Sequence, residues 1–219
     1  MIYIHTTPKG GKILKDFKEI KDAICFSLVN READKEVLRK YPYIEVLDLA
    51  MLFYYKCDKG FKKGAITIIS ERNRKKWGVS LEQLREVAIE NTIRLLPPIF
   101  QTIEQMIDGI AEEENLLIEH EEEPLERMYV LTNEEKYLGA GTILYPEVLS
   151  KVHAQVKADF FIIPSSLHEV IIMLDVGNVM LSNLENLVAE MNEQFLEADE
   201  VLSNNIYRYD SEADELIMM

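Results

Sequence analysis

The chain has little of what membrane proteins and secreted proteins need. Among its 219 residues, the longest uninterrupted apolar runs are far shorter than the roughly 20 residues of a membrane-spanning helix. The N-terminal segment has no apolar stretch before its lysines, so no signal peptide is expected. Only two cysteines are present, Cys25 and Cys57, and they form no CxxC pair. We therefore expect no disulfide framework, and a reduced, cytoplasmic location is the simplest interpretation.

Motifs that bind cofactors or activate nucleophiles are also scarce. Neither half of the sequence contains a glycine-rich phosphate loop or a dinucleotide fingerprint, so no cofactor is expected. Three of the four histidines, His5, His120 and His153, are isolated in the sequence. Cys25 is expected in the core, and Cys57 follows Lys56, which could mildly activate its thiol. No histidine close in sequence completes a nucleophile pair with Cys57.

Positive charge is scarce in the second half of the chain. Residues 1–111 hold 19 Lys and Arg against 15 Asp and Glu, whereas residues 112–219 hold 5 against 24. This asymmetry predicts two regions that have different partners or attract each other. The segment 112–126 holds eight glutamates and no Lys or Arg, and is interpreted as an acidic linker. A solvated helix end that continues into a loop is an equal alternative.

Residues 1–111 are predicted to be rich in helix, with one β-hairpin. Apolar spacings of three and four predict a helix from Ile13 that Asn30 ends, and a second short helix over 31–40. Residues 46–70 are expected to form the hairpin, although its first half could equally begin a buried helix.

Two further helices are expected before the acidic segment. Ser80 and Gln83 predict a capping box at the start of the first helix, which Pro97 and Pro98 end. A second amphipathic helix is expected over 99–113.

The pattern after Arg127 is that of hairpins separated by helices. The expected elements, in order, are strands 128–132 and 140–145, a helix over 146–157 with Pro146 at its first position, strands 159–165 and 168–174, a helix over 181–196, and a last strand at 205–210. This order predicts an antiparallel sheet covered by helices, so the fold class is α+β.

Five segments of the sequence resemble one known family, with similar order and gaps. They are "LDLAMLFYY", "WGVSLEQLREVAIENTIRLLPP", "MYVLTNEEKYLGAGTILYPEVL", "FIIPSSLHEVIIM" and "VLSNNIYRYD". These segments are similar to domain-of-unknown-function family 5688, a bacterial family, over about residues 13–210. A looser likeness exists to domain-of-unknown-function family 1444. The resemblance implies a shared fold and no particular activity. Family members usually carry a further N-terminal region, so a short member or one part of a split gene is expected.

The loop "PSSLHE" is the first candidate site, with Ser165, Ser166, His168 and Glu169. As a catalytic site it would use a serine nucleophile and His168 as base, but it lacks a G-x-S-x-G elbow and a visible oxyanion hole. As a metal site it lacks the second histidine of H-E-x-x-H, so His153 or Glu147 would have to contribute. The third alternative is a hairpin loop whose serines bond local backbone and whose histidine caps the turn.

A basic segment is the second candidate site. Between Lys56 and Lys76 there are eight Lys and Arg and two acids, with Phe61 and Trp77 nearby. The candidate residues are Lys56, Lys62, Lys63, Arg72, Arg74, Lys75 and Lys76. These side chains could bind the phosphates of a nucleic acid in a non-specific contact that weakens with salt. The net charge of −15 argues against a nucleic-acid partner, and docking on the acidic half is the alternative.

Together these patterns favour a non-catalytic binding module of two sub-regions. The acidic C-terminal half would face a protein partner, with the "PSSLHE" loop at one edge of that surface. A hydrolytic or metal-assisted enzyme centred on His168 and Glu169 is the alternative function, and weak nucleic-acid contact through residues 56–76 is another. No membrane partner is expected, and no oligomeric state is predicted.

Overall fold

The computed structural model describes residues 15–56, 66–114, 128–175, 177 and 181–219. Two antiparallel sheets and their helices make up the fold, which confirms the predicted α+β class. The first part of the chain forms α1 (Phe17–Ile20), η2 (Lys21–Ala23), β1 (Ile24–Asn30), α2 (Lys35–Leu38), β2 (Tyr43–Val46), β3 (Leu49–Lys56), β4 (Ile66–Ile68), α3 (Glu71–Trp77), α4 (Leu81–Leu95), β5 (Pro98–Thr102) and α5 (Ile103–Glu114). The second part forms β6 (Met128–Asn133), η4 (Gly139–Leu144), α6 (Val148–Val156), β7 (Phe160–Ile163), β8 (Val170–Leu174), α7 (Leu181–Phe195), β9 (Tyr207–Asp210) and β10 (Glu215–Met218).

Sheet A contains β1 to β4, with β3 at its centre. β1 pairs along one edge of β3, while β2 and β4 pair with opposite halves of its other edge. The β3–β4 pair confirms the hairpin predicted over 46–70. The tip of that hairpin, including Cys57, Phe61, Lys62 and Lys63, lies outside the described residues.

The helix predicted from Ile13 to Asn30 is wrong after Ala23, because Ile24–Asn30 is strand β1. Six consecutive residues of this strand, 24–29, are buried. A strand buried on both faces shows no alternation of apolar and polar residues, so periodicity alone cannot separate it from a buried helix.

The open edge of β1 is satisfied by side chains of α4. The Asn91 side-chain amide donates to the Ile24 and Lys21 carbonyls, at 3.0 and 2.6 Å. The Phe26 N–H donates to the Thr92 hydroxyl at 3.0 Å. Two polar residues of a helix therefore replace a neighbouring strand and cover this sheet edge. The capping box of Ser80 and Gln83 at the start of α4 is present as predicted.

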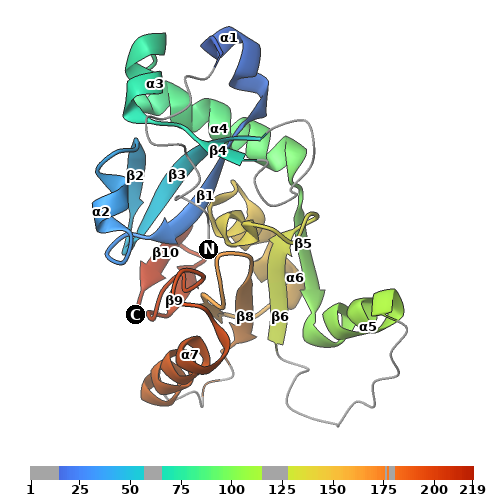
Figure 1. Ribbon diagram of the computed structural model, residues 1–219. Helices are drawn as coiled ribbons and strands as arrows, with labels where there is room; N and C mark the ends of the chain where they lie inside the picture. The colour runs from blue at the N-terminus through green and yellow to red at the C-terminus, as the bar shows by residue number, and fades with distance from the viewer. Residues whose placement is uncertain (1–14, 57–65, 115–127, 176, 178–180) are drawn as a thin grey trace.

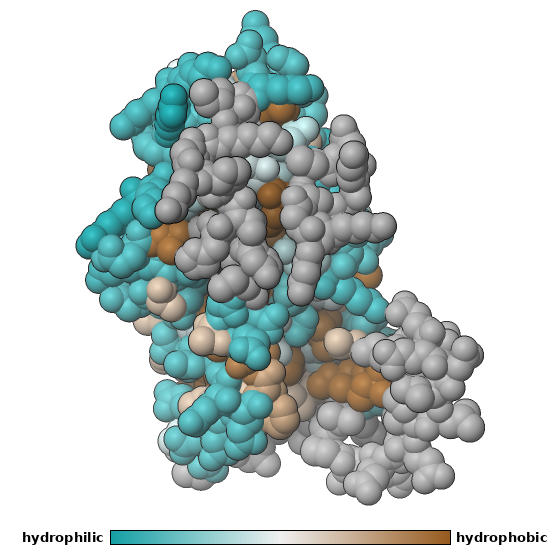
Figure 2. Space-filling view, viewed as in Figure 1, coloured by the Kyte–Doolittle hydropathy of each residue, from teal (hydrophilic) through white to brown (hydrophobic). Residues whose placement is uncertain are grey.

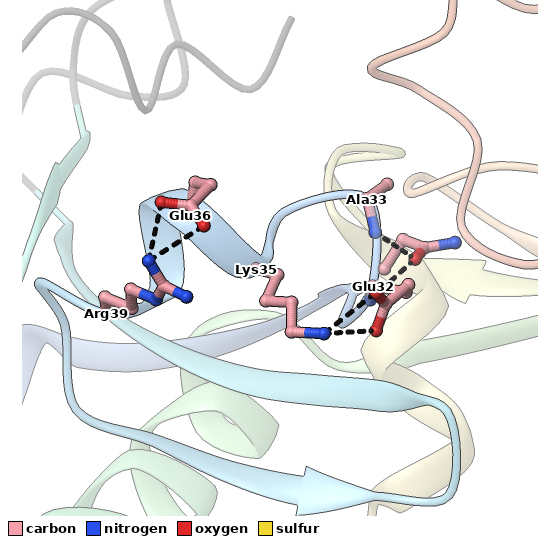
Figure 3. Close-up of polar contacts among 6 residues, drawn as sticks. Glu32, Ala33, Lys35, Glu36 and Arg39 are labelled. Atoms are coloured by element: carbon pink, nitrogen blue, oxygen red, sulfur yellow. Dashed lines mark hydrogen bonds and ion pairs between the residues drawn. The ribbon is translucent and has the colours of Figure 1, made fainter.

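Asn30 ends β1 through a local turn that leads to α2. Its side-chain oxygen accepts the N–H groups of Glu32 and Ala33, at 3.1 and 2.9 Å. Ion pairs three residues apart, Lys35 with Glu32 and Arg39 with Glu36, line the surface of this segment (Figure 3). Both pairs are solvent-exposed, so each contributes at most about 1 kcal/mol.

Sheet B contains six antiparallel strands in the order β10-β9-β7-β8-β6-β5. One face carries Phe160, Ile162 and Tyr207, which belong to the main core together with residues of sheet A. The other face carries Phe161 and Ile163, which pack against α7. In Figure 1, sheet A lies above sheet B, and α7 lies at the lower left beside the C-terminal hairpin.

Three other sequence predictions differ from the structure. The strand expected over 140–145 is the 3₁₀ helix η4, which is buried between the two sheets. The helix expected over 99–113 begins only at Ile103, because Pro98–Thr102 forms the edge strand β5. Pro146 precedes the helix α6 instead of starting it, since Glu147 is the N-cap residue.

One hydrophobic core contains residues from before and after the acidic segment. It includes Phe26 and Phe53 of sheet A as well as Leu131 and Phe160 of sheet B. Residues 112–114 of the predicted linker form the end of α5, and the rest of it lies outside the described residues. The division into two sub-regions joined at 112–126 therefore stays a prediction.

Candidate functional site

The "PSSLHE" loop joins β7 to β8 and lies against the loop that follows β6. The Thr132 hydroxyl donates to the His168 carbonyl at 2.7 Å, and the Ala140 N–H donates to the Leu167 carbonyl at 3.3 Å. Two of the segments that carry the family resemblance, "MYVLTNEEKYLGAG" and "PSSLHE", are thus brought together by the sheet.

His168 is held by a backbone hydrogen bond to its ring. The Leu138 N–H donates to Nδ1 at 3.0 Å, and the ring stacks on Tyr137 with centroids 5.1 Å apart. Because Nδ1 accepts this bond, the neutral ring carries its proton on Nε2. To act as a base or a metal ligand through Nε2, the ring would have to move that proton to Nδ1 and lose the Leu138 bond.

Ser166 is also used inside the loop. Its hydroxyl donates to the Glu169 carboxylate at 3.0 Å and accepts the His168 N–H at 3.0 Å. The Ser165 N–H donates to the Ile163 carbonyl at 2.9 Å. The hydroxyl of Ser166 is therefore directed to Glu169, whereas the imidazole of His168 is directed to Leu138. The local bond of Ser166 is as the hairpin-loop interpretation expects, whereas the His168 ring bonds the loop that follows β6 and does not cap its own turn.

Gly139 explains why the two loops can lie so close together. A Cβ at this position would overlap the Thr132 hydroxyl and the His168 carbonyl, and would lie 2.8 Å from the Asn133 nitrogen. The preceding loop also contains two non-glycine residues with positive φ, Lys136 at 49° and Leu138 at 55°. Each such conformation costs about 1 kcal/mol, so the contacts of this loop must offset local strain.

A buried group of polar side chains lies between this loop and sheet A. Cys25 and Tyr54 are cross-strand neighbours on β1 and β3, and both are fully buried. Burial raises the pKa of the Cys25 thiol and of the Tyr54 and Tyr137 hydroxyls, so all three stay protonated at neutral pH. Among the described residues, the Tyr54 hydroxyl is the buried side-chain group without a hydrogen-bond partner.

A second polar group, centred on Asp48, joins the two sheets. Asp48 lies in the turn between β2 and β3, and its carboxylate accepts three side-chain hydrogen bonds from the C-terminal part of the chain. The donors are Ser203 at 2.6 Å, Tyr207 at 2.7 Å and Asn205 at 2.9 Å. Sequence reasoning did not select these residues as a site. The only signal was their presence in the segments "LDLAMLFYY" and "VLSNNIYRYD".

The described part of the basic segment is largely paired with acids. Lys56 lies 3.7 Å from Glu135, which belongs to the acidic half of the chain. Arg74 bonds Glu71 through two nitrogens, at 2.5 and 2.8 Å, and lowers the pKa of that carboxyl. Lys75 lies 3.7 Å from the same carboxylate. The side chains of Arg72 and Lys76 are exposed, whereas Lys62 and Lys63 lie outside the described residues.

The structure does not gather metal ligands around His168. His153 instead lies 3.5 Å from Asp159 and close to the ring of Tyr209, while Glu147 pairs with Lys151. Across the described ranges, no group of three or more His, Cys, Asp or Glu side chains could hold a metal ion. Within the same ranges, no helix is long and apolar enough to cross a membrane.

Comparisons with known proteins identify a family but no individual curated protein or solved structure. No curated protein and no solved structure gives a significant match. A model described as "Family of unknown function" (DUF5688) matches residues 3–211, which is nearly the whole chain and confirms the principal resemblance. The looser likeness to family 1444 stays a prediction. The chain therefore belongs to the family of unknown function DUF5688.

Proposed function

We propose that this protein is a non-catalytic binding module whose partner is a protein that docks on α7 and the C-terminal hairpin β9–β10. The observation that carries this proposal is the exposure of large apolar side chains there. Phe195 is 76 % exposed and Leu187 is 46 % exposed, both on α7. Ile217 of β10 is 41 % exposed and lies on the same face of sheet B, because its partner Arg208 pairs with Phe161. Exposed apolar groups on one face are typical of protein interaction sites.

The charge of this surface supports a specific type of contact. Residues 181–219 hold ten Asp and Glu and a single cation, Arg208. Arg208 already bonds Asp159, at 2.5 Å. The segment that carries the exposed apolar side chains is thus strongly acidic, which favours a partner of positive charge and speeds its association.

The geometry of the "PSSLHE" loop supports the non-catalytic part of the proposal. An enzyme centred on His168 needs a free ring nitrogen and a nucleophile or ligand directed toward it. The Ser166 hydroxyl bonds Glu169, and the accepting nitrogen of His168 already holds the Leu138 N–H. Among the residues that the structure describes, no contact favours the enzymatic or the nucleic-acid alternative over docking of a protein.

A pull-down with matched variants tests the proposal. The tagged full-length chain would be incubated with a lysate of its source organism at low salt, with and without nuclease. Phe195→Ser changes the proposed surface, while Leu47→Asn removes an apolar side chain, 37 % exposed, from the β2–β3 turn of sheet A, outside α7 and β9–β10. Leu47 has a φ of 55°, which asparagine adopts readily, so this control should fold normally.

The proposal predicts a protein that is retained by wild type and Leu47→Asn and lost with Phe195→Ser. Partner loss with His168→Ala alone would contradict it, because the interface would then lie at the "PSSLHE" loop. Recovery of nucleic acid that salt releases and nuclease removes would support the basic segment instead. A lysate that yields no protein dependent on Phe195 would count against the proposed surface.

A further inference from the structure

The exposed apolar residues of α7 form a ridge along one side of the helix. Leu187, Met191 and Phe195 follow one another at intervals of four residues, so they lie on neighbouring turns over about 12 Å. A second row, which includes Leu184, Val188 and Asn192, is the one buried against the protein. The ridge flanks that buried row, and Met191 is only partly exposed. We name Leu187, Met191 and Phe195 the α7 ridge.

The α7 ridge lies on the less covered face of sheet B. α7 packs on Phe161 and Ile163 of β7, and Ile171 and Met173 of β8 next to them are only partly buried. Figure 2 shows brown and tan surface beside the teal of α7 on this face. A partner laid along the ridge could therefore continue onto apolar side chains of the sheet.

The charges around the α7 ridge select the class of occupant. α7 carries Glu185, Glu190 and Glu193 and has no Lys or Arg. A second copy of this chain in a symmetric contact, α7 against α7, would bring the same acidic helix to the ridge, and anionic membranes and nucleic acids would also be repelled. A cationic partner with an apolar face avoids this repulsion and gains from charge complementarity.

We propose that the occupant of the α7 ridge is a basic amphipathic helix of a protein partner, with its apolar face on the ridge and its Lys or Arg side chains toward the glutamates of α7. Helices that dock in this way present apolar residues at spacings of three and four, which match a ridge of spacing four. This inference rests on the proposed function and adds the chemistry of the partner.

A designed peptide probes this chemistry without knowledge of the natural partner. The probe is a fluorescein-labelled helix of about 15 residues, made of Leu at helical spacing and Lys elsewhere, because isolated helices much shorter than this are marginal in water. A second peptide has Gln in place of every Lys. The full-length chain is titrated into each peptide, and fluorescence anisotropy gives Kd at about 0.05 M and about 0.5 M salt, where charge screening differs strongly.

Two pairs of matched variants separate the α7 ridge from general attraction to an acidic protein. Phe195→Ser removes the most exposed side chain of the α7 ridge, and Leu47→Asn is its control. Glu190→Lys reverses a charge beside the ridge, and Glu86→Lys makes the same change at an exposed position of α4. Because Phe195 is 76 % exposed, its variant should unfold at the wild-type temperature, which circular dichroism would check.

The proposal predicts salt-sensitive binding of the Lys peptide and at least about tenfold weaker binding to Phe195→Ser, as expected for loss of one buried aromatic contact. Glu190→Lys should weaken binding several-fold more than Glu86→Lys, and Leu47→Asn should bind as wild type does. Equal Kd values for all four variants, or equal binding of the Gln peptide, would overturn the inference. If the pull-down partner still depends on Phe195 in that case, the proposed function stands and only the partner chemistry is wrong.

Discussion

Removal of the Asp48 carboxylate should reveal how strongly the two sheets depend on each other. The Ser203 and Tyr207 residues that bond Asp48 are both fully buried. In Asp48→Ala their hydroxyls lose a charged acceptor, and water replaces it only in part because Asp48 is half-buried. A buried donor left unpaired costs about 1–3 kcal/mol, so with partial replacement by water we expect a loss of about 2–3 kcal/mol in the free energy of unfolding. The third donor, Asn205, adds less because its contact is exposed.

Urea unfolding followed by two probes would measure this loss. Trp77 is the single tryptophan of the chain, and it lies against Phe17 at 5.7 Å beside α4, so its fluorescence reports on the region of sheet A. Far-UV circular dichroism reports on the whole chain. If Asp48 couples the sheets, the two transitions should coincide in wild type and separate in Asp48→Ala.

Two further variants test the reasoning about Asp48. In a double-mutant cycle, Asp48→Ala and Tyr207→Phe should show a coupling of at least about 1 kcal/mol, because they share one hydrogen bond. Glu45→Ala removes an exposed acid of the same hairpin, which pairs with Arg31, and should cost less than about 1 kcal/mol. A loss below about 1 kcal/mol for Asp48→Ala, or additive effects in the cycle, would refute the coupling.

Three other substitutions have clear expectations. Gly139→Ala should destabilise the chain by about 2 kcal/mol or more, since its Cβ would overlap backbone and side-chain atoms of the two facing loops. The Cβ of Gly141→Ala would meet only the Phe26 ring, at 3.2 Å, so this control should cost less. Thermal unfolding of both variants would show the difference. Tyr54→Phe should change stability by no more than about 1 kcal/mol, because the buried hydroxyl that it removes has no hydrogen bond of normal geometry in the described part of the chain and interacts weakly with the Cys25 thiol; a larger loss in urea unfolding would contradict this. Thr92→Val should lower the free energy of unfolding by about 1–3 kcal/mol, because the Phe26 N–H would lose its acceptor. Hydrogen exchange at the Phe26 amide should accelerate, and an unchanged exchange rate would argue against the bond.

Elements with strong local signals were predictable from the sequence. The capping box at Ser80, the end of α3 at Gly78 and the amphipathic helix α7 all depend on residues within a few positions of one another. Gly78 has a φ of 67°, which glycine adopts at little cost. Local chemistry of this type does not need knowledge of the rest of the fold.

Buried segments were not predictable in the same way. The segments of β1 and η4 contain few polar residues. The segment of β1 was expected to be helix but is a strand, and the segment of η4 was expected to be strand but is a 3₁₀ helix. In β1 the choice depends on pairing with β3 and on the side chains of Asn91 and Thr92, which lie more than 60 residues away. Such long-range contacts override the weak local preference of a short apolar run.

The candidate sites were likewise predictable from the sequence only in part. The sequence correctly marked the "PSSLHE" loop as polar, but only the structure places its His168 ring on the Leu138 N–H. Helical periodicity puts Leu187 and Phe195 close to the apolar side of α7, yet the position of the helix on sheet B leaves these two exposed. Whether an apolar side chain is covered depends on its neighbours in space, which helical periodicity does not specify.

The sequence by itself determined the α+β class, the acidic character of the second half, the family and the helices whose ends carry caps. These features follow from composition and from residues near one another along the chain. The tertiary structure alone decided which apolar runs become strands, the contact of Asp48 with Ser203 and Tyr207, and the exposure of the α7 ridge. Asp48 and Tyr207 are 159 positions apart, and only the packing of the two sheets brings them within hydrogen-bond distance.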